Sequence, residues 1–316
     1  MPSPGWSSFA TCWRRAGSTP RCAGETARRP GPRTPPRPLD RLRPPPLSSP
    51  PISGEVRLKA VILAGGRGTR MGTEGTLPKP MTDLAGRPLV WHAMRSLAAQ
   101  GIDEFILALG HRGEAFRHYF LNYRAMTADL SIDLRTGRLT HGRQEAEPWL
   151  VHLVDTGQAT ETGGRLKRLA PWLAAESDFL LTYGDSLADI DLAALLACHR
   201  REGRLATVTA VRTRSRFGHP RLEGDRVSEF REKPADGSGW INGGYFLLKP
   251  AVIELIAGDE TVWEREPLEQ LAQSGELAAY RHGGFWGCVD TPDDLAALEA
   301  LTRAGDPPWL RARQPA

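Results

Sequence analysis

The chain has 316 residues and a formal net charge of +4, but its charge and its prolines are unevenly distributed. Residues 1–57 contain 13 of the 26 prolines and ten arginines against three acidic residues, which leaves residues 58–316 slightly acidic. The basic excess therefore lies outside the part of the chain that can form a core, and composition gives no support for a nucleic-acid-binding protein.

The amino-terminal segment 1–57 differs from the rest of the chain in composition. A segment so rich in proline and arginine cannot bury a core, so we expect a disordered Pro/Arg-rich extension followed by one folded domain over residues 58–316. The extension lacks the apolar run of a secretory signal peptide, and its prolines oppose the amphipathic helix of a transit peptide. An alternative is that translation starts near Val56.

Apolar runs and cysteines indicate the expected compartment. No apolar run reaches the roughly 20 residues that a membrane span needs, so we expect no membrane association. The chain has four cysteines, two of them in the extension, and no Cys-x-x-Cys pair. This usage favours a reduced protein without disulfides, located in the cytoplasm.

The stretch from Leu58 to Pro80 carries the clearest chemical signal. Ala60–Leu63 is a short apolar run typical of a buried strand. Glycines and cations follow it, namely Gly65, Gly66, Gly68, Arg67, Arg70 and Lys79. Because glycine lets backbone N–H groups approach an anion, we expect a phosphate-binding loop at the carboxyl edge of an α/β sheet, with a tight strand-to-helix turn as the alternative. The loop lacks the Gly-Lys-Ser/Thr of Walker A, and Met71 replaces the third glycine of the dinucleotide fingerprint.

The next elements alternate between helix and strand. Apolar residues at helical spacing predict a helix from about Val90 to Ala98, and Phe105–Leu109 predicts the next strand. A further helix is expected over about Glu114–Tyr123. Residues 125–148 are polar and irregular, so we expect an insertion outside the sheet, which resumes at Leu150–Val154.

Two later segments combine the end of an element with a chemically useful residue. Thr162-Gly-Gly-Arg165 begins a helix whose first N–H groups, together with Arg165, could bind an anion; a simple glycine-opened helix is the alternative. The strand Phe179–Tyr183 is followed by Asp185, a natural metal ligand at such a position, with helix capping as the competing role. Asp189 and Asp191 stand at the start of the following helix, where we expect them to act as caps.

The rest of the chain continues the alternation. Expected strands are Leu205–Val211, Tyr245–Leu248 and Leu277–Arg281, expected helices are Ala251–Ala257 and Pro267–Gln273, and a last helix opens near Pro292. Helices between successive strands imply parallel pairing. The sequence therefore predicts an α/β fold with a mostly parallel mixed sheet flanked by helices.

Several segments together carry a family resemblance that extends from Leu58 to Trp309. The most specific ones are Gly65-Gly-x-Gly-Thr-Arg70, Pro78-Lys-Pro80, Thr162-Gly-Gly-Arg-Leu-Lys-Arg168, Thr182-Tyr-Gly-Asp185, Glu232-Lys-Pro234, Ile241-Asn-Gly-Gly244 and Trp263-Glu-x-Glu-Pro267. They resemble the sugar-1-phosphate nucleotidylyltransferases. The segments that begin at Thr162 and Trp263 are similar to those of the glucose-1-phosphate cytidylyltransferase branch in particular.

This resemblance implies a Rossmann-like nucleotidyltransferase fold and transfer of a cytidylyl group from CTP to α-D-glucose 1-phosphate, giving pyrophosphate and CDP-glucose for CDP-linked deoxysugars. It implies that CTP is bound by Leu63, Ala64, Gly65, Gly66, Arg67, Gly68, Thr69, Arg70, Lys79, Thr162 and Gly163. The implied catalytic residues are Lys79, Arg70 and Arg165; Glu232, Lys233 and Asn242 would bind the sugar phosphate, and Asp185 and Asp290 would bind Mg²⁺. Members of the family form homo-oligomers, so we expect one here, partly through the 125–148 insertion.

Some positions depart from the family pattern. The loop between Arg70 and Lys79 is one residue shorter, Ser186 stands in place of a glycine, and His219-Pro220 and Gly287-Cys288 replace other pairs. None of these changes removes a charged residue that the chemistry needs. The alternatives are the same transfer with another nucleotide or hexose 1-phosphate, or an inactive ligand-binding relative. A nicotinamide-dependent dehydrogenase fits less well because the glycine spacing is wrong.

Overall fold

The computed structural model describes residues 58–66, 77–142, 147–212, 219–223, 226–231 and 240–311. The predictions made for residues 1–57, 67–70 and 232–233 fall outside these ranges. None of the helices within the ranges has the length and apolar character needed to cross a bilayer.

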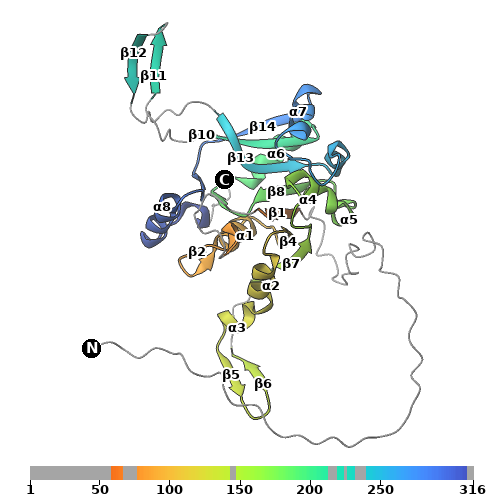
Figure 1. Cartoon of the computed structure of the whole chain (residues 1–316), viewed down its shortest axis with the longest axis vertical. Coiled ribbons are helices and arrows are strands. Elements are labelled where there is room, and N and C mark those ends of the chain that lie inside the picture. The colour runs from red at the N-terminus through yellow and green to blue at the C-terminus, as the bar shows by residue number, and fades with distance from the viewer. Residues whose placement is uncertain are drawn as a thin grey trace, which may run out of the picture. The chain divides into compact units, whose positions relative to one another are not determined.

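A seven-stranded sheet forms the centre of the fold, with the strand order β14-β10-β13-β8-β1-β4-β7 (Figure 1). Its strands are β1 (Lys59–Ala64), β4 (Glu104–Leu109), β7 (Leu150–Asp155), β8 (Phe179–Tyr183), β10 (Ala206–Arg212), β13 (Trp240–Leu248) and β14 (Leu277–His282). All neighbouring strands are parallel except β13, which runs antiparallel to β8 and β10. The predicted α/β fold with a mostly parallel mixed sheet is confirmed.

The register of β1 explains why its sequence is a continuous apolar run. Ala60 lies opposite Phe105 of β4 and Leu180 of β8, so β1 is covered by a parallel strand on each side. Ala60 and Ile62 belong to one buried cluster, whereas Val61 and Leu63 belong to another on the opposite face. A strand that is buried on both faces needs apolar residues at every position. The carboxyl ends of β1, β4 and β8 consequently meet at one edge of the sheet.

Helices cover both faces of the sheet (Figure 1). The first cluster includes residues of α1 (Leu89–Ala98), α2 (Gly113–Leu121) and α6 (Leu192–Glu202). The second includes residues of α4 (Thr162–Arg168), α5 (Ala170–Leu173) and α7 (Glu266–Gln273). The last helix, α8 (Pro292–Arg303), opens with a capping box between Thr291 and Asp294. Asp191 caps α6 as predicted, whereas Asp189 lies 3.0 Å from His282 Nε2 and is not the cap.

Short elements complete the described chain. They are the 3₁₀ helices η3 (Lys79–Met81), η4 (Pro250–Leu255) and η5 (Pro308–Leu310), and the two-stranded ribbons β2 (Asp83–Leu84) with β3 (Arg87–Pro88), β5 (Leu130–Asp133) with β6 (Arg138–His141), β9 (Ser186–Ala188) with β15 (Trp286–Cys288), and β11 (His219–Glu223) with β12 (Arg226–Arg231). The helix expected over Ala251–Ala257 is the 3₁₀ helix η4. Pro250 opens it, and its C-cap Ile256 is already extended, so no full α-helical turn develops.

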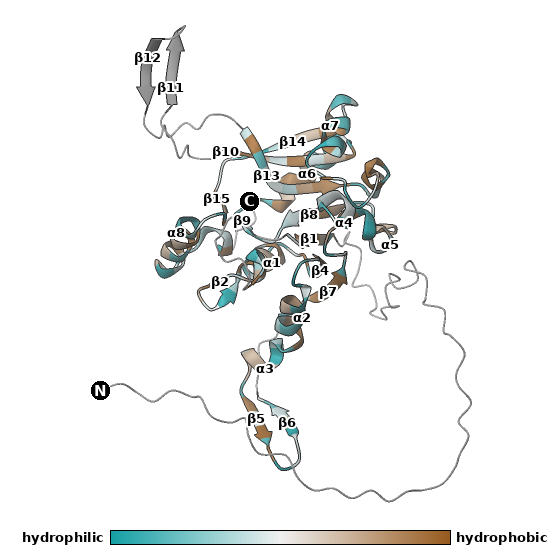
Figure 2. Ribbon diagram, in the orientation of Figure 1, coloured by the Kyte–Doolittle hydropathy of each residue, from teal (hydrophilic) through white to brown (hydrophobic). Residues whose placement is uncertain are grey.

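The insertion contains secondary structure that the sequence did not predict. The helix expected over Glu114–Tyr123 ends at Leu121, and α3 (Tyr123–Thr127) and the β5–β6 hairpin follow it. Figure 2 shows β5 in the hydrophobic colour although it is exposed, with Ile132 52% and Leu130 36% accessible. Leu139 of β6 is also 56% exposed. The insertion therefore presents aliphatic side chains that its own elements do not bury.

Candidate active site

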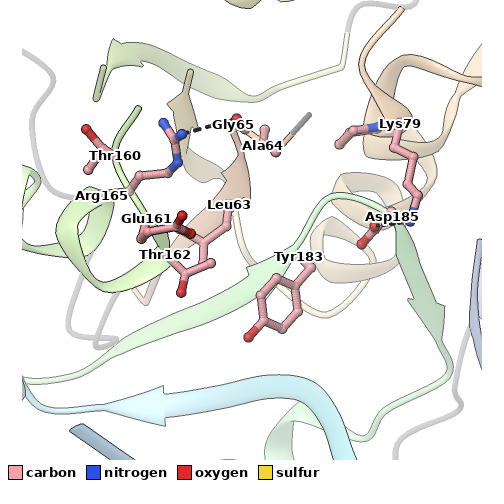
Figure 3. Close-up of a pocket in the computed structure, with 12 residues that line it drawn as sticks. Leu63, Ala64, Gly65, Lys79, Thr160, Glu161, Thr162, Arg165, Tyr183 and Asp185 are labelled. Atoms are coloured by element: carbon pink, nitrogen blue, oxygen red, sulfur yellow. Dashed lines mark hydrogen bonds and ion pairs between the residues drawn. The ribbon is translucent and has the colours of Figure 1, made fainter. Parts of the chain in front are cut away.

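A cavity of about 300 Å³ opens at the carboxyl ends of β1 and β8. Its walls are formed by Leu63, Ala64, Gly65, Gly66, Lys79, Pro80, Thr160, Glu161, Thr162, Arg165, Tyr183 and Asp185 (Figure 3). Ligands of open α/β sheets bind at this edge, beyond the carboxyl ends of the strands. The structure thus brings most of the described residues of the predicted nucleotide site around one cavity; Gly163 does not line it.

Close packing between β8 and η3 places Lys79 at the cavity. Gly184 follows β8, and its N–H donates to the carbonyl of Leu63 at 3.1 Å. A Cβ at Gly184 would lie 2.8 Å from the Cβ of Pro80, closer than side chains allow. Glycine at position 184 therefore lets the Pro78-Lys-Pro80 turn lie against the end of β8, with the Lys79 side chain at the level of Asp185.

The ammonium group of Lys79 lies between two carboxylates. Its Nζ is 2.6 Å from Asp290 Oδ1 and 3.4 Å from Asp185 Oδ2. Burial opposes the charged form, but the hydrogen bond to Asp290 and the charge of Asp185 raise the pKa of Lys79 above its ordinary value. Burial also raises the pKa of Asp185, an effect that Lys79 counteracts.

Asp185 and Asp290 come together through the β9–β15 ribbon. Cys288 pairs with Ser186, and the N–H of Val289 donates to the carbonyl of Asp185 at 3.0 Å. Each aspartate is thereby held at the end of this ribbon, although 105 positions separate them in the sequence. The Sγ of Cys288 lies 3.8 Å from Asp290 Oδ2, and burial raises the pKa of this thiol to about 12.

The aspartate pair can hold one divalent cation. Both carboxylates already reach a single cationic centre, the Nζ of Lys79. Among the residues that the structure describes, no set of three His, Cys, Asp or Glu side chains converges on one point. A pair of carboxylates suits Mg²⁺, which usually takes only one or two of them and completes its shell with water and substrate phosphates.

Arg165 lines the cavity, where the sequence indicated it, but its hydrogen-bond partners are ones that the sequence did not indicate. The residue is only 4% exposed, and its guanidinium donates to the carbonyls of Gly65 at 3.1 Å, Leu109 at 3.1 Å and Gly157 at 2.7 Å. These oxygens follow or end β1, β4 and β7, so one side chain links the carboxyl ends of three strands. Burial lowers the pKa of Arg165. A role in binding an anion remains a prediction.

The first amides of α4 also have partners within the protein. The N–H groups of Gly163 and Gly164 both donate to the carbonyl of Thr261, at 2.9 and 3.2 Å. The hydroxyl of Thr162 donates to Glu264 Oε2 at 2.6 Å. The carbonyl of Thr261 therefore competes with an anion for these amides. The sequence could not reveal this acceptor, because it lies about 100 positions away.

The predicted sugar-phosphate residues are only partly described. Asn242 lies in β13, where its Oδ1 accepts a hydrogen bond from the N–H of Gly244 at 2.8 Å, and it does not line the cavity. Thr160, Glu161 and Tyr183 line the cavity without having been predicted. Tyr183 ends the strand that leads to Asp185, and this position was the available signal for it.

Comparisons with known proteins identify the family. The family model described as nucleotidyl transferase matches residues 59–302. The chain is 44% identical over 253 residues to glucose-1-phosphate cytidylyltransferases of Salmonella typhi and Salmonella typhimurium, covering 80% of this chain and 98% of each relative.

Solved structures share the fold at low sequence identity. HddC from Yersinia pseudotuberculosis matches with a TM-score of 0.58 and 23% identity, over 78% of this chain and 99% of that one. The inositol-1-phosphate CTP transferase from T. maritima matches with a TM-score of 0.54 and 17% identity, over 80% and 97%. The chain belongs to the nucleotidyl transferase family and, within it, to the group of the glucose-1-phosphate cytidylyltransferases.

Proposed function

We propose that the protein transfers a cytidylyl group from CTP to α-D-glucose 1-phosphate, giving CDP-glucose and pyrophosphate. The observation that carries this proposal is the meeting of Lys79, Asp185 and Asp290 beside the cavity at the carboxyl edge of the sheet. The relatives with 44% identity support the choice of CTP and glucose 1-phosphate.

The reaction requires charge stabilisation more than proton transfer. An oxygen of the sugar phosphate attacks the α-phosphorus of CTP, a new P–O bond forms, and the bond to the β-phosphate breaks to release pyrophosphate. The attacking oxygen is already anionic, so no general base is needed. Catalysis then depends on bringing two polyanions together and on fixed positive charge near the α-phosphorus. Lys79 supplies such a charge at the cavity wall.

We propose Mg²⁺ as the metal ion, held by Asp185 and Asp290. When bound, it supplies positive charge to the phosphates of both reactants. Arg67, Gly68, Thr69 and Arg70 are proposed for the triphosphate, with Arg70 on the leaving pyrophosphate, and Glu232, Lys233 and Asn242 for the sugar phosphate. These roles rest on the family resemblance.

We also propose that the protein forms a homo-oligomer through the insertion. Exposed aliphatic side chains of the β5–β6 hairpin, among them Ile132 and Leu139, support this interface. Sedimentation of the wild type and of an Ile132→Asp, Leu139→Asp variant tests it, and an unchanged mass would contradict it. For its compartment we propose the cytoplasm, supported by Cys198 and Cys288, which are both free cysteines.

The test of the function is pyrophosphate release with CTP, UTP, GTP or ATP in the presence of glucose 1-phosphate and Mg²⁺. We expect turnover with CTP to exceed that with the other nucleotides. Turnover with another nucleotide alone would correct the base assignment. Absence of turnover with all four would instead favour a ligand-binding relative without activity.

A further inference from the structure

The Trp263-Glu-x-Glu-Pro267 segment packs against the start of α4. Trp263 is fully buried, with its ring centroid 5.9 Å from that of Phe246, and it anchors the segment in the core. A Cβ at Gly163 would lie 2.7 Å from the carbonyl oxygen of Thr261, and a Cβ at Gly164 would lie 2.6 Å from the Cα of Asp259. The two glycines of the Thr162-Gly-Gly-Arg165 motif therefore allow this close contact. Two motifs that are distant in sequence form one interface.

Glu264 lies in this interface and binds two residues of the cavity wall. Its Oε2 accepts from the hydroxyl of Thr162 at 2.6 Å, and its Oε1 accepts from the hydroxyl of Tyr183. The N–H of Trp263 donates to the same Thr162 oxygen at 2.9 Å. Thr162 belongs to α4 and Tyr183 to β8, so the carboxylate joins two elements that form the cavity without lining it itself.

The carboxylate fixes the direction of both hydroxyl hydrogens. A carboxylate accepts hydrogen bonds and donates none, so each hydroxyl must direct its hydrogen toward Glu264. The oxygens of Thr162 and Tyr183 can then only accept hydrogen bonds from any other partner.

Tyr183 also connects this network with the strand that carries Asn242. Gly244 of β13 has φ +77°, and a Cβ there would lie 2.6 Å from Cδ2 of the Tyr183 ring. The ring is thus held between the Glu264 carboxylate and the backbone of β13. Its orientation is set by contacts on both sides.

We propose that Glu264 is a positioning residue for the nucleoside part of the nucleotide: it orients Thr162 and Tyr183 so that they accept hydrogen bonds from donor groups of the nucleoside. This inference rests on the proposed function. Two parts of CTP offer such donors, the amino group of cytosine and the ribose hydroxyls. UTP lacks the amino group and 2′-deoxy-CTP lacks one hydroxyl, so these two nucleotides distinguish the sources.

The test compares the variant Glu264→Gln with the wild type. Glutamine keeps the size but presents one donor, which forces one of the two hydroxyls to reverse its hydrogen. We expect KM for CTP to rise about tenfold with kcat nearly unchanged, because the reversed hydroxyl would meet a donor of the nucleoside with its hydrogen instead of a lone pair. Glu266→Gln is the matched control, because Glu266 is exposed in the same segment and undergoes the same loss of charge. We expect it to keep the wild-type KM.

Single hydroxyl deletions keep the inference testable if Glu264→Gln folds poorly. Thr162→Val and Tyr183→Phe should each raise KM for CTP, and combining either with Glu264→Gln should add less than the sum of the separate effects. If the cytosine amino group is the donor, the KM for UTP stays constant across these variants. If the ribose 2′-hydroxyl is the donor, the KM for 2′-deoxy-CTP stays constant; if the 3′-hydroxyl is, the KM changes for both nucleotides.

The outcomes separate the two proposals. An active wild type whose KM for CTP is the same in Glu264→Gln, Thr162→Val and Tyr183→Phe would overturn the positioning role alone. A lower kcat together with a lower melting temperature in Glu264→Gln, without a change in KM, would also overturn it, because a merely structural role gives that pattern. A wild type that turns over no CTP would overturn the proposed function and this inference with it.

Discussion

Charged side chains gather at both edges of the central sheet, where its parallel strands begin and where they end. At the amino edge, Lys59 Nζ lies 3.0 Å from Glu104 and 3.1 Å from Glu176, and His152 Nε2 lies 3.1 Å from Glu104. Lys59, Glu104, Glu176 and His152 form the amino-edge cluster. At the carboxyl edge, Lys79 lies between Asp185 and Asp290.

Both groups contain a lysine between two carboxylates, but their surroundings differ. The amino-edge cluster is closed by packing, with the Trp172 ring centroid 4.7 Å from that of His152, and its members do not line the cavity. Lys79 and Asp185 face the cavity formed by the glycine-ended strands. An ion pair alone therefore does not indicate a site. The edge of the sheet and the glycines that open the backbone there are the more informative features.

The largest expected effect separates the two lysines. Lys79→Ala should lower kcat by about 10²–10³, the usual loss for one donor that stabilises transition-state charge. Lys59→Ala removes the same charge from the opposite edge and should leave kcat within about twofold. Steady-state rates of pyrophosphate release provide the measurement. Near wild-type turnover in Lys79→Ala would remove the distinction between the two edges.

The second comparison concerns the aspartates. Asp290→Asn should raise the Mg²⁺ concentration needed for half-maximal activity by at least about tenfold, because one of two carboxylates that can hold the ion is neutralised. Asp178→Asn is the control, since Asp178 pairs with His199 just before β8, at the amino edge. Titration of activity with Mg²⁺ measures both. An equal response of the two variants would argue against a metal site at Asp290.

Local features of the sequence predicted the sheet and much of the cavity wall. The apolar runs Ala60–Leu63 and Phe179–Tyr183 indicate strands because both faces of a central parallel strand are buried, and Asp185 closely follows the second of them. Contacts between distant segments could not be predicted from local patterns, and the meeting of Asp185 with Asp290 was expected only from the family resemblance. The β9–β15 pairing that brings Asp290 to Asp185, and the contact of Glu264 with Tyr183, depend on tertiary packing that leaves no local pattern.

The hydrogen-bond partners of Arg165 could not be predicted either. A cation after two glycines at a helix start is typical of anion binding. In the structure its donors meet backbone oxygens at the ends of three strands, an arrangement that only the sheet order creates. Residue type and spacing indicated the place of Arg165 but not its partners.

A smaller effect is expected at the amino-edge cluster itself. Glu104→Gln should lower the free energy of unfolding by about 1–2 kcal/mol, because Lys59 and His152 lose a charged hydrogen-bond partner in a largely buried place. It should leave kcat and KM unchanged, since the cluster lies at the edge opposite the cavity. Urea unfolding and steady-state kinetics measure the two properties. A loss of activity at unchanged stability would contradict the closed, structural character of the cluster.

The smallest expected effect is the pH dependence of the difference in unfolding free energy between the wild type and Glu104→Gln. The hydrogen bond from His152 and the charge of Lys59 lower the pKa of Glu104 in the folded protein, against the effect of burial. A carboxyl group whose pKa is lower when folded contributes stability that is complete above its unfolded pKa of about 4.3 and is lost as pH falls through the folded value. The gap in unfolding free energy between the wild type and Glu104→Gln should therefore narrow as the pH falls below about 4. A gap that widens below about pH 4 would mean that His152 and Lys59 do not stabilise the charged form of Glu104, and the amino edge would no longer be the closed counterpart of the active edge.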